Sequence, residues 1–464
     1  MKKRLIMVCV AVFLIVGVSV LILLNNKNKG GNDNKSTKST TSNNTAEVDD
    51  SDYNHDFSNY EEISVNLDEL SSDYKITETA IYHFTGKTSY AIEIDSDTYI
   101  KIILDNVSIN STKSSINVVN SKGVYIELVG NNNLSDSANN TDDTDAVIYS
   151  SDDLIIEGSG TLNINANYKD GIASKDDLVI KSGTYKISAS DDGIRGKDLV
   201  PIMDGNFDIT SSGDAIKSTN DTESDKGNII INGGDFTIKT TNGDGISSIN
   251  TIEITGGKFN ITSGGNNSNT DASMKGIKAE NNITIKSITL DVNAKDDGIH
   301  TNSDITIDGG TYNINTDDDG IHADGKLEIN DGTIIINSAE GLEATYVKIN
   351  GGDITINASD DGINAANKST NYDATLEING GSVTVTVGAG DTDALDSNGN
   401  LYINGGKINI TANSPFDYDG EAKYTGGEMI VNGNATTTIT NQMMGGGGMP
   451  QGNMQIPGGD MRRR

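Results

Sequence analysis

A short phrase recurs along most of this chain and restricts the folds that the chain can adopt. Most copies have an acidic residue, then Gly or Ala, then an aliphatic residue, and neighbouring copies are most often 21 or 22 residues apart. A repeat of this size cannot bury its apolar side chains alone, so the copies must stack along one axis. The aliphatic positions are Val147, Ile172, Ile194, Ile216, Ile246, Ile277, Ile299, Ile321, Leu342, Ile363 and Leu395.

Between these phrases, apolar and polar residues alternate on both sides of a glycine pair, as in residues 252–261 (IEITGGKFNI). This alternation is the period of a β-strand, and the glycines mark a change of direction. We therefore expect an all-β fold, a right-handed single-stranded parallel β-helix (solenoid) with coils of about 22 residues. An antiparallel sandwich would not need the same residue types at the same phase of consecutive repeats. A propeller would need blades of roughly 40 residues.

Composition divides the chain into four segments. In residues 1–24, Lys2, Lys3 and Arg4 precede an apolar run that is long enough to span a bilayer, which predicts a signal anchor or a signal peptide. Residues 25–60 are predicted as a flexible polar linker, residues 61–440 as the β-helix domain and residues 441–464 as a disordered Gly/Met-rich tail. We expect an extracellular or cell-surface protein, membrane-anchored or secreted.

Much of the formal charge of −33 occupies one position of the repeat, just before the Gly or Ala. Lys275 and Glu340 depart from a series that is otherwise aspartate. Equivalent positions of stacked coils lie about 4.8 Å apart, so neighbouring carboxylates would repel by roughly 3 kcal/mol at an effective dielectric of about 20. We call this series the Asp column: Asp145, Asp170, Asp192, Asp214, Asp244, Asp297, Asp319, Asp361 and Asp393.

Three arrangements could offset this repulsion. Ca²⁺ takes six to eight oxygen ligands, which acids on neighbouring coils can supply. Alternatively, the aspartates cap backbone N–H groups in the turn before Gly, or basic neighbours neutralise them. Doubled acids favour Ca²⁺ as a cofactor, and the predicted metal ligands are Asp191, Asp192, Asp214, Asp244, Asp296, Asp297, Asp318, Asp319, Asp360 and Asp361.

The residue after each aliphatic anchor should point outward, and the middle of this second series is basic. Such side chains could hold an anionic glycan, with Arg making forked contacts to a uronate carboxylate; simple pairing with the Asp column is the other interpretation. Insertions at two phases of the coil, 131–144 with 264–275 and 220–227 with 367–374, should flank this face. The predicted glycan-binding residues are Arg195, Lys217, Lys278, His300 and His322.

The Asp-Gly-Ile phrases, the Ile-x-Gly-Gly-x-Phe/Tyr-x-Ile phrases, the N-terminal anchor with its spacer and the Gly/Met tail together resemble the clostridial secreted carbohydrate-binding β-helix family. The resemblance extends from about Tyr90 to about Gly420. It implies a pectate-lyase-like right-handed β-helix with bound calcium and affinity for plant cell-wall glycans such as cellulose and polygalacturonate. It also implies that the Asp of each Asp-Gly-Ile phrase is a calcium ligand.

The expected function is therefore that of a calcium-stabilised carbohydrate-binding protein that recognises plant cell-wall polysaccharides. A calcium-dependent polysaccharide lyase is the alternative, with Lys217, Lys278 or Arg195 as base, and a structural or adhesive surface protein is another. No catalytic residue is assigned, because a ladder of similar sites contains no single distinct constellation. The expected partners are a polysaccharide and, if residues 1–24 stay attached, the membrane; we expect a monomer and no nucleic acid.

Overall fold

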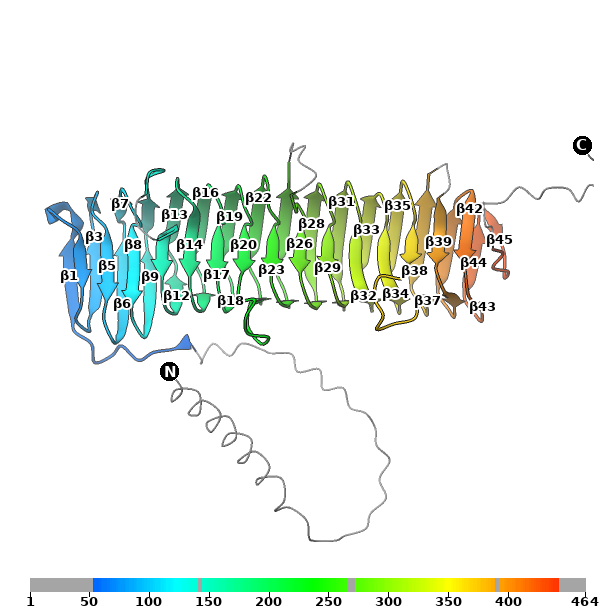
Figure 1. Ribbon diagram of the computed structural model, residues 1–464, viewed down its shortest axis with the longest axis horizontal. Coiled ribbons are helices and arrows are strands. Elements are labelled where there is room, and N and C mark those ends of the chain that lie inside the picture. Colours follow the sequence, from blue (N-terminus) through cyan, green and yellow to red (C-terminus); the bar gives the residue numbers. More distant parts are fainter. Residues whose placement is uncertain (1–52, 141–143, 266–271, 389–391, 442–464) are drawn as a thin grey trace, which may run out of the picture. The chain divides into compact units, whose positions relative to one another are not determined.

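The computed structural model describes residues 53–140, 144–265, 272–388 and 392–441, and it shows a parallel β-helix (Figure 1). Each coil contributes one strand to each of three ladders, and strands of neighbouring coils pair in parallel. In Figure 1 the near strands point down and the far strands point up while the coils advance from left to right, which is right-handed winding. The prediction of a right-handed single-stranded β-helix is confirmed.

The first ladder contains the aliphatic anchors. Its strands are β2 (Tyr74–Ile76), β5 (Ile92–Asp95), β8 (Ile116–Asn120), β11 (Ala146–Ser150), β14 (Asp170–Ser174), β17 (Ile194–Gly196), β20 (Ile216–Ser218), β23 (Ile246–Ser248), β26 (Ile277–Ala279), β29 (Ile299–Thr301), β32 (Ile321–Ile329), β34 (Leu342–Ile349), β36 (Ile363–Ala365), β39 (Asp393–Ser397) and β42 (Ser414–Tyr418). The long strands β32 and β34 continue into the second ladder.

The second ladder follows the first after a short corner. Its strands are β1 (Glu62–Asn66), β3 (Ile81–Thr85), β6 (Tyr99–Asp105), β9 (Gly123–Val129), β12 (Leu154–Gly158), β15 (Leu178–Ile180), β18 (Leu199–Ile202), β21 (Asn228–Ile231), β24 (Ile252–Ile254), β27 (Ile283–Ile285), β30 (Ile305–Ile307), β37 (Thr375–Ile378), β40 (Asn400–Ile403) and β43 (Ala422–Tyr424). A short 3-10 helix, η2 (Leu67–Glu69), follows β1.

The third ladder completes each coil after the glycine turn. Its strands are β4 (Lys87–Thr88), β7 (Ser108–Asn110), β10 (Asn131–Ser135), β13 (Thr161–Ala166), β16 (Thr184–Ala189), β19 (Asn206–Ser211), β22 (Asp235–Thr240), β25 (Lys258–Ser263), β28 (Ile288–Ala294), β31 (Gly310–Thr316), β33 (Thr333–Ser338), β35 (Asp353–Ala358), β38 (Ser382–Val387), β41 (Lys407–Thr411), β44 (Glu428–Val431) and β45 (Asn434–Ala435). β45 pairs antiparallel with β44 and ends the ladder.

The core is a set of parallel columns of buried side chains. Isoleucines stack from coil to coil in all three ladders, and four aromatic rings stack face to face along the third. The ring centroids of Tyr185, Phe207, Phe236 and Phe259 are 4.9, 4.5 and 4.6 Å apart in turn. Because every coil places the same residue type at the same point, each column excludes water along its length.

The Asp-Gly-Ile phrase has a steric reason as well as a polar one. A Cβ on Gly193 would lie 2.6 Å from the carbonyl oxygen of Ala215 in the next coil and 2.6 Å from Cγ2 of Ile209 in its own coil. Real Cβ atoms do not approach other atoms so closely, so only the smallest residues fit between the corner and the core. Ile194 then points into the core and is fully buried.

One anchor differs from the sequence prediction. In β11, Ile148 and not Val147 pairs with Ile172, and Ala146 lies opposite Asp170. Both Val147 and Ile148 are buried, so the hydrophobic pattern alone did not identify the residue in register.

The segment 53–60 lay within the predicted linker, but it packs on the outside of the second ladder. The His55 ring stacks on Tyr99 with centroids 4.1 Å apart, and Phe57 meets Tyr125 edge to face at 5.1 Å. The aromatic side chains of this segment cover an apolar patch on the outside of the second ladder. Within the described ranges, no helix is long and apolar enough to cross a bilayer. The predicted anchor (1–24) lies outside those ranges, and so does the predicted tail (441–464) apart from Asn441.

Candidate functional site

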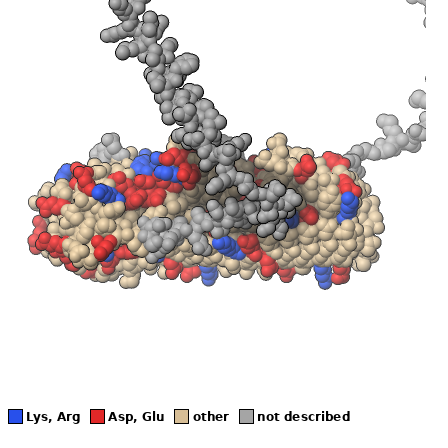
Figure 2. All heavy atoms as spheres, turned by 90° about the horizontal axis from the view of Figure 1, so that it is seen from below, with Lys and Arg blue, Asp and Glu red and all other residues tan. Residues whose placement is uncertain are grey.

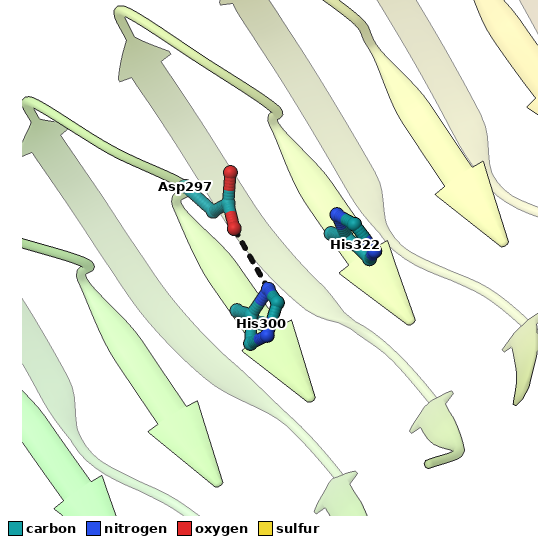
Figure 3. Close-up of side chains that lie close together, drawn as sticks. All are labelled: Asp297, His300 and His322. Carbon is teal, nitrogen blue, oxygen red and sulfur yellow. Dashed lines mark hydrogen bonds and ion pairs between the residues drawn. The ribbon is translucent and has the colours of Figure 1, made fainter. Parts of the chain in front are cut away.

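The outer surface of the first ladder carries a continuous row of side chains, one from each coil. Register pairs this row, the outer column, as Tyr149, Ala173, Arg195, Lys217, Ser247, Lys278, His300, His322, Glu343, Asn364 and Asp396. Figure 3 shows His300 and His322 at the same point of adjacent strands. The predicted glycan-binding residues therefore share one face. Tyr149 takes the place that the sequence pattern gave to Ile148, because the register of β11 is shifted by one residue.

The Asp column runs along the corner that leads into this face, and its side chains hold the corner backbone together. One carboxylate oxygen of six of the nine aspartates accepts the backbone N–H of the equivalent residue in the next coil. The bonds run from Asp192 to Asp170 (3.1 Å), Asp214 to Asp192 (2.8 Å), Asp244 to Asp214 (2.7 Å), Lys275 to Asp244 (2.8 Å), Asp319 to Asp297 (3.1 Å) and Asp393 to Asp361 (2.7 Å). This is backbone capping, one of the three arrangements considered from the sequence.

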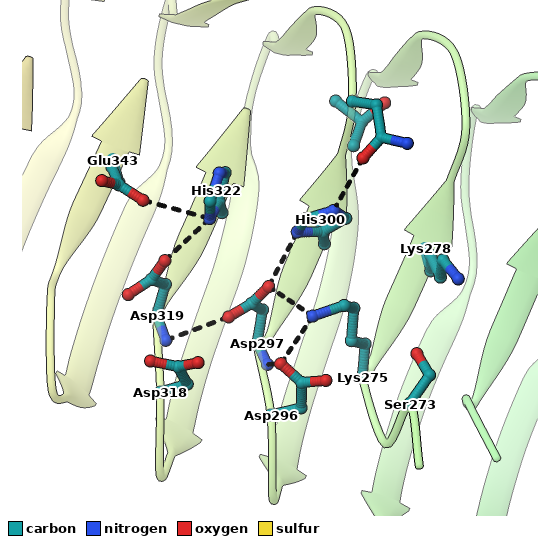
Figure 4. Close-up of polar contacts among 12 residues, drawn as sticks. Ser273, Lys275, Lys278, Asp296, Asp297, His300, Asp318, Asp319, His322 and Glu343 are labelled. Carbon is teal, nitrogen blue, oxygen red and sulfur yellow. Dashed lines mark hydrogen bonds and ion pairs between the residues drawn. The ribbon is translucent and has the colours of Figure 1, made fainter. Parts of the chain in front are cut away.

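Several of these aspartates also pair with a basic side chain, as Asp297 does with Lys275 and His300 (Figure 4). Arg195 lies 2.6 Å from Asp170 and 2.8 Å from Asp145, and it is only 9% exposed. Lys217 lies 2.9 Å from Asp214 and 3.3 Å from Asp192. Charge pairing thus accompanies capping, and it leaves Arg195 little surface for contact with a ligand.

Burial sets the protonation behaviour of the column. It raises the pKa of Asp170 to about 7, because the attraction of Arg195 does not fully offset the loss of hydration. It also raises the pKa of Asp192 to about 6. Asp297 is the opposite case: hydrogen bonding from His300 and the charge of Lys275 outweigh burial and hold its pKa well below the ordinary value.

A hollow of about 320 Å³ opens on this face between two lysines of the outer column. Lys217 and Lys278 stand on either side of Ser247, whose short side chain leaves the gap, and Asp214 and Asp244 form the wall. Lys278 is 3.6 Å from Glu280. Two predicted glycan contacts and two predicted metal ligands thus line the same hollow.

At the C-terminal end of the face the basic residues give way to carboxylates. Burial, reinforced by the charges of Asp361, Asp393 and Asp417, raises the pKa of Asp396 to about 7. One buried carboxylate oxygen of Asp417 has no hydrogen-bond partner among the described residues. No Lys or Arg in the described ranges forms a salt bridge with Asp396 or Asp417. This donor set suits Ca²⁺, which prefers carboxylate oxygens.

The ten predicted metal ligands fall into several places along one corner. One group joins Asp191 and Asp192 to Asp170, and another joins Asp296, Asp297 and Asp318, each with carboxylate oxygens within 4.8 Å of one another. Asp214 and Asp244 line the hollow, and Asp319 lies beside His322. The charge of Asp361 raises the pKa of Asp396, and Asp360 is exposed. No single cage contains them all.

The opposite corner, between the first and second ladders, holds acidic residues that the sequence prediction missed. Asp153, Asp176 and Asp177 bring oxygens within 4.8 Å of one another. Burial raises the pKa of Asp177 to about 6, and that of Asp176 to about 6. Figure 2 shows acidic side chains, with basic ones among them, gathered over the N-terminal half of the side seen there. The sequence carries two acidic pairs, 152–153 and 176–177, at the same phase of two repeats. This pattern could have predicted the acidic corner.

A shallow groove of about 790 Å³ lies at the end of the third ladder. It crosses successive coils, and its lining is mainly uncharged and polar. Asn337 donates to Asn315 at 2.9 Å, and Asn357 donates to Asn337 at 3.1 Å, so amides repeat along the groove. Such a surface offers donors and acceptors at a regular spacing without strong charge.

Comparisons with known proteins identify the family of this chain. A family model described as a carbohydrate-binding domain-containing protein matches residues 71–320 and again residues 315–462. Because these matches cover more than half of the chain, the protein belongs to this carbohydrate-binding domain family. The expected family resemblance is confirmed at that level.

One curated relative and one solved structure are also similar. A carbohydrate-binding domain-containing protein of Acetivibrio thermocellus is 34% identical over 139 residues, which are 27% of this chain and 49% of that protein. The chain therefore spans about half the length of that relative. A polysaccharide lyase-like protein from C. thermocellum, solved as a gadolinium derivative, is 27% identical with a TM-score of 0.41, covering 53% of this chain and 96% of the other.

Proposed function

We propose that this protein is an extracellular, calcium-stabilised module that binds acidic polysaccharides of the plant cell wall on the outer face of its first ladder. The observation that carries the proposal is the hollow between Lys217 and Lys278. Its volume of about 320 Å³ lies in the range of about 300–1,000 Å³ that is typical of ligand sites. Membership of a carbohydrate-binding family supports the class of ligand.

The lysines give the hollow its selectivity for acidic sugars. The side chain of Lys217 is 33% exposed while two aspartates hold its ammonium group in place. A uronate carboxylate can accept hydrogen bonds from the ammonium groups of Lys217 and Lys278. The hydroxyl groups of the sugar ring can form hydrogen bonds with Ser247 and with the carboxylates of the wall. Ordered side chains lose little entropy on binding, which favours affinity.

Calcium is proposed at the C-terminal end of the face, where four carboxylates gather. The carboxylates of Asp361, Asp393, Asp396 and Asp417 supply oxygen donors, and a buried oxygen of Asp417 lacks a partner among the described residues. Ca²⁺ would replace protons there and hold neighbouring coils together. Arg195 or Lys217 already offsets the charge of the predicted ligands with which it pairs, so a bound ion would stabilise those carboxylates less.

The geometry gives less support to a lyase. Arg195 is buried against carboxylates. Its neighbours raise the pKa of Lys217 above the ordinary value, whereas a general base needs a lowered pKa. A neutral glycan such as cellulose remains the second candidate ligand, and the asparagine-lined groove of about 790 Å³ is the place that would suit it.

Location outside the cell is proposed from the apolar run that Lys2, Lys3 and Arg4 precede. Export would expose the β-helix to millimolar calcium and to wall polysaccharide. Fractionation of the producing cells should recover the protein from the surface or the medium, and recovery from the cytosol would contradict this part of the proposal.

Affinity electrophoresis in gels containing polygalacturonate tests the proposal. With calcium present, the wild-type chain should be retarded. The double variant Lys217→Gln/Lys278→Gln should lose at least about tenfold in affinity. A hydrogen bond to a charged group contributes about 1.5–3 kcal/mol, and an exposed ion pair contributes less. The matched control is Lys239→Gln/Lys258→Gln, two exposed lysines on β22 and β25 of the third ladder. It should bind like the wild type.

Two results would count against the proposal. Absence of retardation by polygalacturonate, with or without chelator, would exclude an acidic-glycan site. Retardation by a soluble cellulose derivative that is unchanged in the Lys217/Lys278 variant would move the binding site to the asparagine-lined groove.

A further inference from the structure

Two consecutive coils carry the same five-residue phrase, Asp-Asp-Gly-Ile-His, at residues 296–300 and 318–322. The β-helix places the two histidines side by side on β29 and β32, in direct register. Their ring centroids are 4.8 Å apart, and both point outward from the first ladder (Figure 3). Among the described residues of a chain with only four histidines, this pair is a distinct chemical feature.

Carboxylates surround the imidazole pair on a rigid surface. One ligand atom from each of Asp297, His300 and His322 lies within 4.8 Å of the others, and the same holds for Asp319, His322 and Glu343. Nδ1 of His300 is 2.7 Å from Asp297, and Nδ1 of His322 is 2.8 Å from Asp319 and 3.2 Å from Glu343 (Figure 4). Asp297 and Glu343 are buried, at 2% and 4% exposure.

We propose that Asp297, His300 and His322 form a binding site for a first-row transition-metal cation of the Zn²⁺ class, with Asp319 and Glu343 as the adjoining carboxylates. Imidazole nitrogen is a ligand that Zn²⁺, Ni²⁺ and Co²⁺ prefer, whereas Ca²⁺ takes oxygen ligands in larger number. Ligand atoms around a tetrahedral ion at about 2.1 Å lie roughly 3.4 Å apart, so small side-chain rotations would close the site. The proposal does not depend on glycan binding.

The local charge also favours a divalent cation. Asp296, Asp297 and Asp318 bring carboxylate oxygens within 4.8 Å of one another, and Asp319 and Glu343 add two more carboxylates beside them. The cation already present at Asp297 is the ammonium of Lys275, which lies 2.7 Å from Asp297 and 2.5 Å from Asp296. Lys275 also departs from the Asp column. It therefore competes with a metal for Asp297, and its removal should strengthen metal binding.

A structural consequence follows from the position of the ligands. Asp297 lies just before β29, His300 lies in β29 and His322 in β32. The adjoining Glu343 lies in β34, so the group spans three successive coils. A bound ion would therefore join these coils across the face of the first ladder, and it would resist separation of the strands.

The test uses the full chain, stripped of metal with a chelator and titrated with ZnCl₂ alone in a buffer near pH 8, because Zn²⁺ must displace the protons on the ring nitrogens and a higher pH favours this exchange. The wild type should bind Zn²⁺, and His322→Gln and His300→Gln should each weaken this site by at least about tenfold. His83→Gln is the matched control, since His83 also lies between two carboxylates, Glu62 at 3.1 Å and Asp105 at 3.2 Å. It should bind like the wild type.

Two further measurements separate a ligand role from a structural one. Lys275→Gln should bind Zn²⁺ more tightly than the wild type. CoCl₂ titrated into the wild type should produce visible absorption bands of nitrogen- and oxygen-ligated Co²⁺ that are absent in His300→Gln/His322→Gln. Unchanged Zn²⁺ affinity in both histidine variants, or displacement of Zn²⁺ by an equal concentration of Ca²⁺, would overturn the proposal.

Discussion

The Gly or Ala of the repeated phrase lies where a larger side chain would clash with the next coil and with the core. Gly193 has no room for a side chain between the carbonyl of Ala215 and the core residue Ile209. The natural occurrence of Ala215 and Ala394 at the same position shows that one methyl group can be accommodated.

Gly193→Val should therefore destabilise the β-helix by about 3 kcal/mol, whereas Gly193→Ala should cost about 1 kcal/mol, because overpacking increases with each added carbon. Denaturant melts of the two variants, with Ala215→Gly as a control of small expected effect, measure the difference. Equal stability of the Val and Ala variants would contradict the steric explanation.

Residue patterns in the sequence were sufficient to predict the Asp column and its proximity to a basic row. The capping bonds from Asp214 to Asp192 and its equivalents follow from the strict phase of the repeat. The pairing of Asp396 with Asp417 was not predicted, because Asp417 lies in a coil without the Asp-Gly-Ile phrase. The shift from Ile148 to Tyr149 was missed because two adjacent apolar residues fit the pattern equally well.

Among the elements, the segment 53–60 is the clearest addition to the repeat. It covers an apolar patch formed by Tyr125, Ile155 and Val179 on the outside of the second ladder. Tyr53 donates to Asp177 at 2.8 Å, so the segment also reaches the acidic corner. The sequence pattern placed this segment in the polar linker, because the rings that it contacts lie in distant coils.

Replacement of His55 and Phe57 by Ala should expose this patch and lower the local stability of β9 and β12 by about 2 kcal/mol, from lost ring contacts and burial. Hydrogen exchange should become faster in β9 and β12 and stay unchanged in β38 and β41, because each coil of a solenoid contacts only its neighbours. Unchanged exchange in β9 would show that the segment contributes nothing to stability.

At the scale of the whole molecule, the stacked carboxylates link stability to pH. Half-buried groups with raised pKa values include Glu340 and Asp396, both at about 7, and Asp177 at about 6. The folded chain binds protons on these groups more tightly than the unfolded chain. Their stabilising effect is therefore present at low pH and is lost as the pH rises through 6 to 7. His322, with its pKa raised to about 9, acts in the same direction at higher pH.

In chelator, the melting temperature should consequently fall on the order of 5 °C or more between pH 5 and pH 8. Glu328, whose pKa is lowered to about 2, loses its contribution only below that window. Calcium should flatten the dependence, because the ion replaces the protons. Melts by circular dichroism in chelator and in calcium measure both slopes, and a melting temperature that rises with pH in chelator would contradict the account.

We propose that one face of the β-helix combines bound calcium with a basic hollow for an acidic glycan. A crystal structure of the chain grown with calcium and an oligogalacturonate tests it most directly. We expect the sugar over Ser247 between Lys217 and Lys278, and a calcium ion beside Asp396 and Asp417. A sugar bound only in the asparagine-lined groove, with no ion at the acidic end of the face, would contradict the claim.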